Sequence, residues 1–222
     1  MKTLIERAKR IQAEGIFLGG KLENFEIAGR KLMITLLSEG LTPSSKVLDI
    51  GCGCLRGGYW LIHFLDKGCY FGIEPNTKML DAGLRLLLEP GLINIKQPRF
   101  HHNSDFDFTV FKERFDFLVA LSIWTHISKS QIQTMLAGFV NTAKADGIFI
   151  TSYYNATLFK PDYKGLIPIG TGFHSNTLGF VHHRFDWIRS ECKKKGLEAK
   201  EIKEKAFKYW NQTWVRIKHS AN

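Results

Sequence analysis

The sequence alternates short apolar runs with longer segments in which apolar residues recur at helical spacing. The runs predict buried strands at 46–50, 70–73, 115–121 and 148–151, with a weaker strand near 95–102. The helical spacing predicts helices at 24–39, 59–65, 76–88, 128–143 and 184–195. Strands that alternate with helices predict a parallel sheet covered by helices on both faces.

Residues that favour turns and helix ends support these boundaries. Gly40 follows the first of these helices, Asn76 is placed to cap the third, and Pro90-Gly91 closes it. Ser128 with Gln131 has the spacing of a capping box, and Asp146-Gly147 is expected to turn into the strand at 148–151. Two late strands, 199–202 and 213–218, suggest an antiparallel hairpin at the sheet edge.

These elements predict an α/β three-layer sandwich whose mostly parallel seven-stranded sheet ends in an antiparallel hairpin. The 222 residues fit one domain, 1–222, with helices in the N-terminal segment 1–44. Residues 154–183 are rich in Gly, Asn, Thr and aromatic residues and follow neither period. We expect that segment to be a lid or a substrate loop.

The stretch KVLDIGCGCLRGG carries the strongest chemical signal. Gly51 and Gly53 follow a strand, so the backbone can turn sharply there and approach a ligand closely. The helix that begins after them offers unpaired N–H groups to a carboxylate. Asp49, at the strand end, is placed to accept a hydrogen bond from an ammonium group or from a water beside it.

A dinucleotide reading of this turn does not fit. The pattern G-x-G-x-x-G needs glycine at position 56, which is Arg56, and a carboxylate at Asp49 would repel a pyrophosphate. The turn suits a zwitterionic amino-acid tail better. Glu74 ends the second strand where a carboxylate can accept both ribose hydroxyls, which supports a nucleoside ligand without choosing between the two cofactor classes.

Taken in order, VLDIGCG, GIEPN, FDFLVALSIWTHIS and GIFITSY resemble the motifs of class I S-adenosylmethionine-dependent methyltransferases, over residues 45–151. The resemblance implies S-adenosyl-L-methionine as cofactor. It assigns the methionine part to the first motif, the ribose to Glu74 beside Pro75, and adenine to Asp105 with Phe106. The remaining cofactor positions that it implies are Asp49, Gly51, Cys52, Gly53, Arg56, Gly57, Ala120 and Leu121.

The first motif departs from the family pattern at its third glycine. That glycine would fall at Leu55, and the next glycines come later, as Gly57 and Gly58 behind Arg56. Arg56 then either contacts the cofactor carboxylate or braces the loop. We favour the first role, because a guanidinium pairs bidentately with a carboxylate.

Just past the fourth strand, His126 has two readings of equal weight. An imidazole titrates near neutrality, so His126 is a candidate general base facing the methyl acceptor. It could equally pack against the following helix or cap it. Trp124, Tyr153 and Tyr154 are candidates for the acceptor wall, although aromatic residues at strand ends are more often core.

Composition limits the partners. The net charge of +10 would attract anions such as RNA, but the densest basic run, 193–208, is interleaved with glutamates.

Four cysteines without zinc spacing suggest free thiols and no metal site. No apolar stretch reaches the roughly 18 residues of a membrane span. The N-terminus lacks the pattern of a secretory signal, so we expect a cytoplasmic protein.

We therefore expect a methyltransferase that moves a methyl group by in-line displacement onto a small molecule. RNA or protein acceptors are the second choice, since the only sizeable additions to the core pattern are the N-terminal helices and the 154–183 segment. A cofactor-binding protein without transfer activity is the third.

Overall fold

The structure, a computed structural model, describes residues 3–164, 179–203 and 211–220. The chain groups into two compact units, Met1–Ser104 and Asp105–Asn222. The expectation of a single domain stays a prediction. The middle of the proposed lid, 165–178, and the C-terminal half of the basic run, 204–210, lie outside the described residues. Within the described residues, no helix is both long and apolar enough to cross a membrane.

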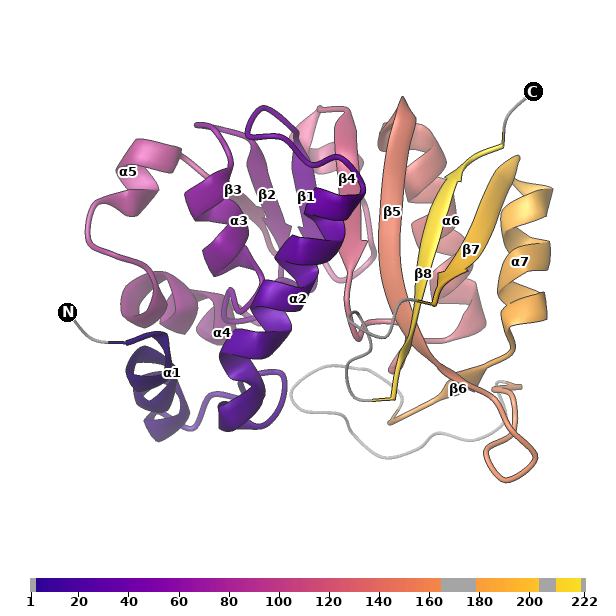
Figure 1. Cartoon of the computed structure of the whole chain (residues 1–222), viewed down its shortest axis with the longest axis horizontal. Helices are drawn as coiled ribbons and strands as arrows, with labels where there is room; N and C mark the ends of the chain where they lie inside the picture. Colours follow the sequence, from indigo (N-terminus) through magenta and orange to yellow (C-terminus); the bar gives the residue numbers. More distant parts are fainter. Residues whose placement is uncertain (1–2, 165–178, 204–210, 221–222) are drawn as a thin grey trace. The chain divides into compact units, whose positions relative to one another are not determined.

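The first unit is built on three parallel strands in the order β3-β2-β1 (Figure 1). The register places Asp49 opposite Gly72 and Ile50 opposite Ile73. Its strands are β1 (Val47–Ile50), β2 (Tyr70–Ile73) and β3 (Arg99–His101). Its helices are α1 (Leu4–Ala13), the 3-10 turn η1 (Leu22–Asn24), α2 (Phe25–Ser38), α3 (Gly58–Phe64), α4 (Thr77–Ala82), the π-helical η2 (Gly83–Leu87) and α5 (Leu92–Lys96).

Every residue of β1 and β2 is buried, as a parallel strand covered on both faces requires. In Figure 1, α2 lies in front of the strands of this unit. It packs on α3 so closely that a Cβ on Gly29 would lie 2.4 Å from the Arg56 carbonyl oxygen. Glycine at this position therefore lets α2 approach the segment that follows β1.

The second unit holds β4 (Phe115–Ala120) parallel to β5 (Ala143–Asn155), and β8 (Thr213–His219) antiparallel to β5. At the sheet edge, β7 (Leu197–Ile202) pairs antiparallel with β8, as predicted. The short β6 (His182–His183) pairs with the end of β5. The helices are the 3-10 turn η3 (Thr109–Phe111), α6 (Lys129–Thr142) and α7 (Phe185–Lys194).

Most of the predicted local signals are confirmed. The Asn76 side chain accepts a hydrogen bond from the Met79 N–H at 3.2 Å, and the Ser128–Gln131 capping box forms in full at the start of α6. The predicted fold class is also confirmed, since the sheet is mostly parallel and its seven main strands end in the antiparallel β7–β8 pair.

Two local predictions were wrong, and one predicted helix has the expected bounds but changes its type. Residues 95–96 belong to α5, not to a strand, because Ile95 is two-thirds exposed and the left-handed Gly91 and Gln97 bound the short helix on both sides. Asp146-Gly147 lies within β5, where the β4–β5 register shifts. The third predicted helix changes to a π-helical turn at Gly83, where the backbone passes close to Cys54.

Candidate active site

The turn between β1 and α3 has its backbone in the left-handed region at three alternate residues. Gly51 has φ 71°, Gly53 has φ 56° and Leu55 has φ 65°. Leu55 stands where the resemblance expects a third glycine. The backbone there keeps the left-handed conformation that glycine favours, although the residue is leucine. Its side chain is fully buried, and this packing offsets the cost of about 1–2 kcal/mol that the conformation imposes on an L-residue.

Asp49 lies at the start of this turn as a buried carboxylate with one oxygen open. Its Oδ2 accepts a hydrogen bond from the Tyr70 hydroxyl at 2.8 Å, whereas Oδ1 has no hydrogen-bond partner among the described residues. Burial raises the pKa of Asp49 to about 6, against the lowering effect of the Tyr70 hydroxyl. The ionised form of this carboxylate is costly because it is removed from water. A cationic or hydrogen-donating neighbour lowers that cost, so the group favours such a ligand.

Glu74 connects the glycine turn to the beginning of α4. Its Oε2 accepts the Gly53 N–H at 2.9 Å and its Oε1 accepts the Asn76 N–H at 2.9 Å. Burial raises the pKa of Glu74, and these two backbone donors lower it. Each carboxylate oxygen has a second lone pair, so ribose hydroxyls can still be accepted. The adjoining Pro75 is exposed in the connection to α4.

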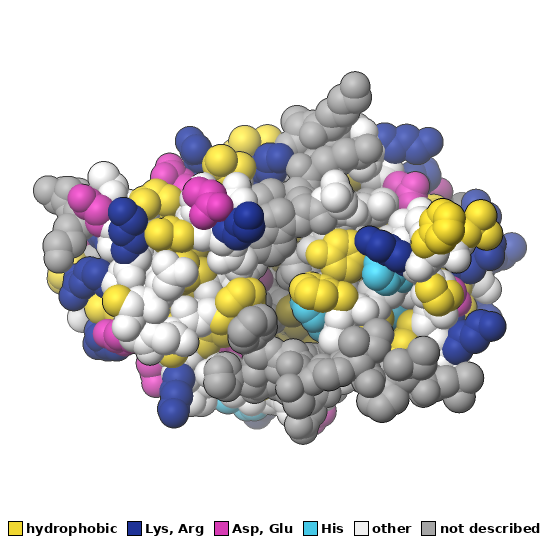
Figure 2. All heavy atoms as spheres, turned by 90° about the horizontal axis from the view of Figure 1, so that it is seen from below, with side chains coloured by type: hydrophobic (Ala, Val, Ile, Leu, Met, Phe, Trp, Pro, Cys, Tyr) yellow, Lys and Arg dark blue, Asp and Glu magenta, His cyan; other side chains and the backbone are white. Residues whose placement is uncertain are grey.

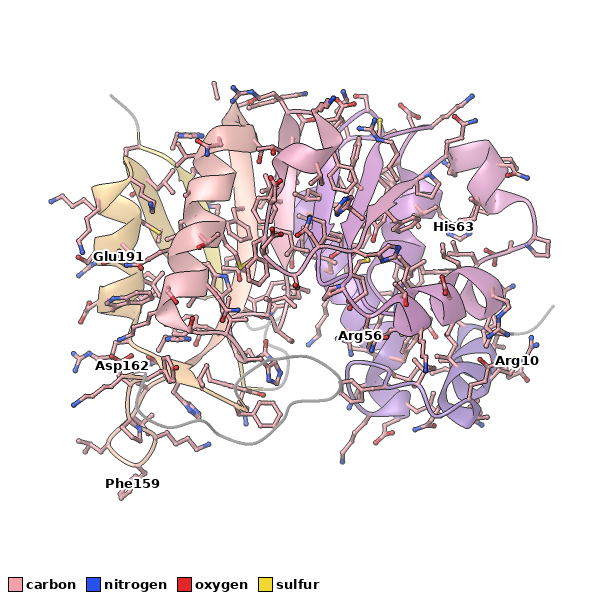
Figure 3. All side chains as sticks on the ribbon, turned by 180° about the vertical axis from the view of Figure 1, so that it is seen from behind. Arg10, Arg56, His63, Phe159, Asp162 and Glu191 are labelled. Carbon is pink, nitrogen blue, oxygen red and sulfur yellow. The ribbon has the colours of Figure 1, made fainter. Side chains whose placement is uncertain are left out.

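The other predicted residues of this turn have contacts of their own. Arg56 donates from Nη1 to the Gly19 carbonyl at 2.9 Å, which is a bracing contact (Figure 3). A Cβ on Gly57 would lie 2.6 Å from Leu32 Cδ2, so a larger residue there would have to displace the end of the Leu32 side chain. Cys52 is buried, and burial raises the pKa of its thiol far above the ordinary value. Because the thiol is neutral, Cys52 would make an apolar contact with a ligand and would not make an electrostatic one.

The second unit carries the remaining predicted cofactor residues. Asp105 is exposed and its Oδ1 accepts the Asp107 N–H at 3.4 Å, while Phe106 is half-buried with φ 60°. Ala120, the last residue of β4, is buried, and its carbonyl accepts the Thr151 hydroxyl at 3.0 Å. Leu121, in the turn after β4, is half-buried.

A buried polar network holds the turn after β4. Ser122 is left-handed, with φ 61°, and its N–H donates to Ser152 Oγ at 2.8 Å. Ser152 Oγ donates to Gln212 Oε1 at 2.6 Å, and Gln212 Nε2 donates back to Ser122 Oγ at 3.0 Å. The network closes on itself within one buried site. It fixes the backbone that leads to His126.

His126 lies beside an exposed ring of the second unit. Its ring centroid is 4.8 Å from that of Phe180, and burial lowers the pKa of the imidazole. It is therefore neutral at pH 7 and able to accept a proton. Trp124 is fully buried against Phe149, and Tyr153 is fully buried with its hydroxyl on Glu201 at 2.8 Å, so both belong to the core.

Eight of the predicted cofactor residues, from Asp49 to Pro75, thus meet around one turn of the first unit. Sequence reasoning missed Tyr70, Ser152 and Gln212, since each acts through a partner far along the chain and none stands in a recognisable motif. Among the described residues, no three His, Cys, Asp or Glu side chains form a group that could hold a metal ion.

Residues 47–147 match a family model described as a methyltransferase domain. No curated protein matches the sequence.

Solved structures extend the likeness to most of the chain. Magnesium protoporphyrin IX methyltransferase from Synechocystis PCC 6803 with bound S-adenosylhomocysteine is 19% identical, with 97% of this chain and 94% of that chain covered and a TM-score of 0.63. A glycopeptide N-methyltransferase complexed with S-adenosylmethionine is 13% identical, with 86% and 94% covered and a TM-score of 0.62. At these identities the likeness shows the fold. Residues 47–147 therefore match a methyltransferase domain, and the chain has the fold of methyltransferases that were solved with S-adenosylmethionine or S-adenosylhomocysteine bound.

Proposed function

We propose that this protein is an S-adenosylmethionine-dependent methyltransferase that transfers the methyl group by in-line displacement to a small-molecule acceptor, with Asp49 and Glu74 as the main cofactor ligands. The observation that carries the cofactor assignment is the buried Asp49 carboxylate, which keeps one oxygen open beside a left-handed glycine turn. An ammonium group satisfies such an oxygen, whereas a phosphate would be repelled.

The roles of the other residues follow from their chemistry and from the resemblance. Glu74 would accept the ribose hydroxyls through the lone pairs that Gly53 and Asn76 leave open. Gly51, Cys52 and Gly53 would line the methionine part with backbone and with an uncharged thiol. The resemblance also assigns Arg56 to the cofactor carboxylate, with which a guanidinium can pair bidentately.

The resemblance carries over to the second unit. It assigns Asp105 and Phe106 to adenine, and Ala120 and Leu121 to the wall of the site. These four assignments rest on the motif positions alone.

S-adenosylmethionine supplies an electrophilic methyl group on a sulfonium sulfur. An acceptor lone pair forms the new bond to that carbon, and the electron pair of the broken C–S bond stays with sulfur. The chain contributes mainly orientation, because a fixed pair of reactants avoids the entropy cost of an encounter. Where the acceptor carries a proton, the neutral imidazole of His126 would take it.

Two further observations support a small acceptor. The proteins of similar fold are named for a porphyrin and a glycopeptide as substrates. Lys and Arg side chains in Figure 2 are separated by uncharged and acidic side chains across that face. A nucleic-acid groove would gather them with aromatic platforms. We also propose that the protein works in the cytoplasm.

Calorimetry with S-adenosylhomocysteine and NAD tests the cofactor assignment. We expect binding of S-adenosylhomocysteine and none of NAD, and tighter binding of NAD would overturn the assignment. Incubation with tritiated S-adenosylmethionine and pools of small molecules, total RNA and protein then identifies the acceptor class. Label that enters only RNA or protein would refute the small-molecule proposal.

RNA binding gives an independent check. If the +10 charge is only a solvated surface, RNA should bind weakly, lose affinity steeply as salt rises, and be unaffected by S-adenosylhomocysteine. Binding at about micromolar Kd or tighter that persists at physiological salt would replace the small-molecule proposal by an RNA methyltransferase.

A further inference from the structure

The loop after β5 carries two neighbouring large apolar side chains that are almost fully exposed. Leu158 is 99% exposed and Phe159 is 95% exposed, whereas the next most exposed large apolar side chain among the described residues, Ile95, reaches 66%. Single exposed apolar side chains are common on protein surfaces, but a contiguous pair at this exposure indicates a site of interaction. We call residues 157–160 the apolar tip.

Backbone hydrogen bonds close the apolar tip into a turn. The Thr157 N–H donates to the Lys160 carbonyl at 2.8 Å, and the Lys160 N–H donates back to the Thr157 carbonyl at 3.2 Å. Pro161 follows directly and restricts the backbone where the turn ends. Leu158 and Phe159 take the two central positions, so the turn itself presents them to the solvent.

The arms of the loop on either side of the tip are bonded to β6. Before the tip, the Ala156 N–H donates to the His183 carbonyl at 3.0 Å. After it, the Tyr163 N–H donates to the His182 carbonyl at 2.8 Å. Figure 3 shows Phe159 at the outer end of the loop, pointing away from its unit. The apolar tip therefore projects from a base of paired backbone.

Positive charge accompanies the apolar tip. Residues 156–164 and 182–189, which are the loop and the segment bonded to it, carry four cationic side chains and two carboxylates. The cations are Lys160, Lys164, Arg184 and Arg189, and all four are exposed. Lys160 belongs to the turn itself and directly follows Phe159.

The two carboxylates of these segments do not cancel that charge. Asp162 forms an ion pair with Lys129, which adds a further cation, and Asp186 forms one with Arg189 at 3.2 Å. Within the described ranges, neither lysine of the loop has a carboxylate partner. The exposed apolar pair is therefore flanked by positive charge that is free to meet an anionic surface.

We propose that the apolar tip inserts into the surface of a membrane that carries anionic lipid headgroups. Leu158 and Phe159 would pass below the headgroups and lose their contact with water, which is the source of the affinity. Lys160 and Lys164 would stay at headgroup level, where each cation gains from the negative surface potential. Such binding needs no membrane-spanning helix, and it does not depend on the proposed methyl transfer.

A protein partner fits these features less well. A stable protein interface buries about 800 Å² on each side, over about 20–30 residues, and lysine is depleted within it. The apolar tip offers two side chains at the end of a loop, with a lysine next to them. A lipid surface requires no matching pocket, because apolar side chains that project beyond a ring of cations can enter it directly.

Flotation of the full chain with lipid vesicles tests the proposal. One set of vesicles is pure phosphatidylcholine, and the other has equal parts of phosphatidylcholine and phosphatidylglycerol. The first variant combines Leu158→Ser with Phe159→Ser, and its matched control is Ile95→Ser, which removes an exposed apolar side chain from α5 of the other unit. The second variant is Lys160→Gln, with Lys67→Gln as its control, since Lys67 is an exposed lysine of that other unit.

We expect the chain to float with the mixed vesicles, to bind pure phosphatidylcholine weakly, and to lose affinity as salt rises. The double serine variant should weaken binding to the mixed vesicles at least about tenfold, because each side chain loses its apolar burial. Lys160→Gln should weaken it about fivefold at low salt, as expected for one cation near an anionic surface. Both controls should bind like the unaltered chain, and equal urea midpoints would show that every variant folds.

Several results would overturn the proposal. The chain might fail to float with the mixed vesicles, or bind both kinds of vesicle equally, or bind as tightly after the double serine change. A chain that ignores vesicles but forms a dimer that the double variant loses would show that the apolar tip contacts protein and not lipid. Calorimetry with S-adenosylhomocysteine is a separate measurement, so failure of vesicle binding leaves the proposed function untouched.

Discussion

Affinity for S-adenosylhomocysteine should fall as the pH falls, because Asp49 must be ionised to pair with the ligand's ammonium group. The pKa of Asp49 is about 6 in the unliganded protein, since burial opposes its ionisation. At about pH 5 only about one-tenth of the molecules would carry the carboxylate that the ligand needs. The apparent Kd should therefore rise about tenfold between about pH 7.5 and about pH 5, or about 1.4 kcal/mol.

The sign follows from linkage. A bound ammonium favours the ionised carboxylate and lowers its pKa, so binding releases a proton below about pH 6 and acid opposes it. The groups that act on Asp49 are Tyr70, Glu74 and Arg56. Of these, only Glu74 is a further carboxylate, and burial raises its pKa as well.

Calorimetry at several pH values measures this effect, and two variants separate the carboxylates. Asp49→Asn should bind weakly with little dependence on pH, whereas Glu74→Gln should bind more weakly than the unaltered chain but keep the slope. An affinity that stays constant from about pH 7.5 to about pH 5 would refute the reasoning. So would an equal slope in Asp49→Asn, because the titrating group would then lie elsewhere.

Three further predictions concern Asp49 again, Glu74 and Ser152. Asp49→Asn should raise the free energy of unfolding of the unliganded protein above about pH 6 by up to about 3 kcal/mol, and the gain should vanish below about pH 4, because only the ionised carboxylate is costly; urea unfolding at both pH values checks this. Glu74→Ala should weaken S-adenosylhomocysteine binding by about 1.5–3 kcal/mol in calorimetry, and an unchanged Kd would contradict its ribose role. Ser152→Ala should lower the free energy of unfolding by about 1–3 kcal/mol, because it leaves the Ser122 N–H without its acceptor, and equal urea midpoints would show that the network contributes nothing.

The strands, the helix caps and the glycine turn were predictable because each depends on neighbours in the sequence. The side chains of Ser128 and Gln131 each accept a hydrogen bond from the other's backbone N–H across one helical turn. Strands β1 and β2 are recognisable in the sequence as short apolar runs. The contact of Tyr70 with Asp49 was not predictable. It depends on the register of two strands, which pairs Val47 with Tyr70, and no local pattern encodes that register.

The network around Ser122 shows the same limit more strongly. Gln212 reaches Ser122 from a position 90 residues along the chain, just before β8. Its place depends on the antiparallel alignment of β8 with β5, so it follows from tertiary structure alone. Leu55 is the opposite case: the motif showed that a glycine was replaced, but only the structure shows that the left-handed backbone was kept.

The contact between α2 and the segment after β1 bears on how this protein can be divided. The family model begins at residue 47, yet the segment it includes is packed against residues that come before it. Gly29 lies against the Arg56 carbonyl and the Trp60 indole, and Gly19 accepts a hydrogen bond from Arg56. A fragment cut at the matched boundaries would uncover these surfaces, so we expect it to be less stable than a chain that keeps the residues before position 47.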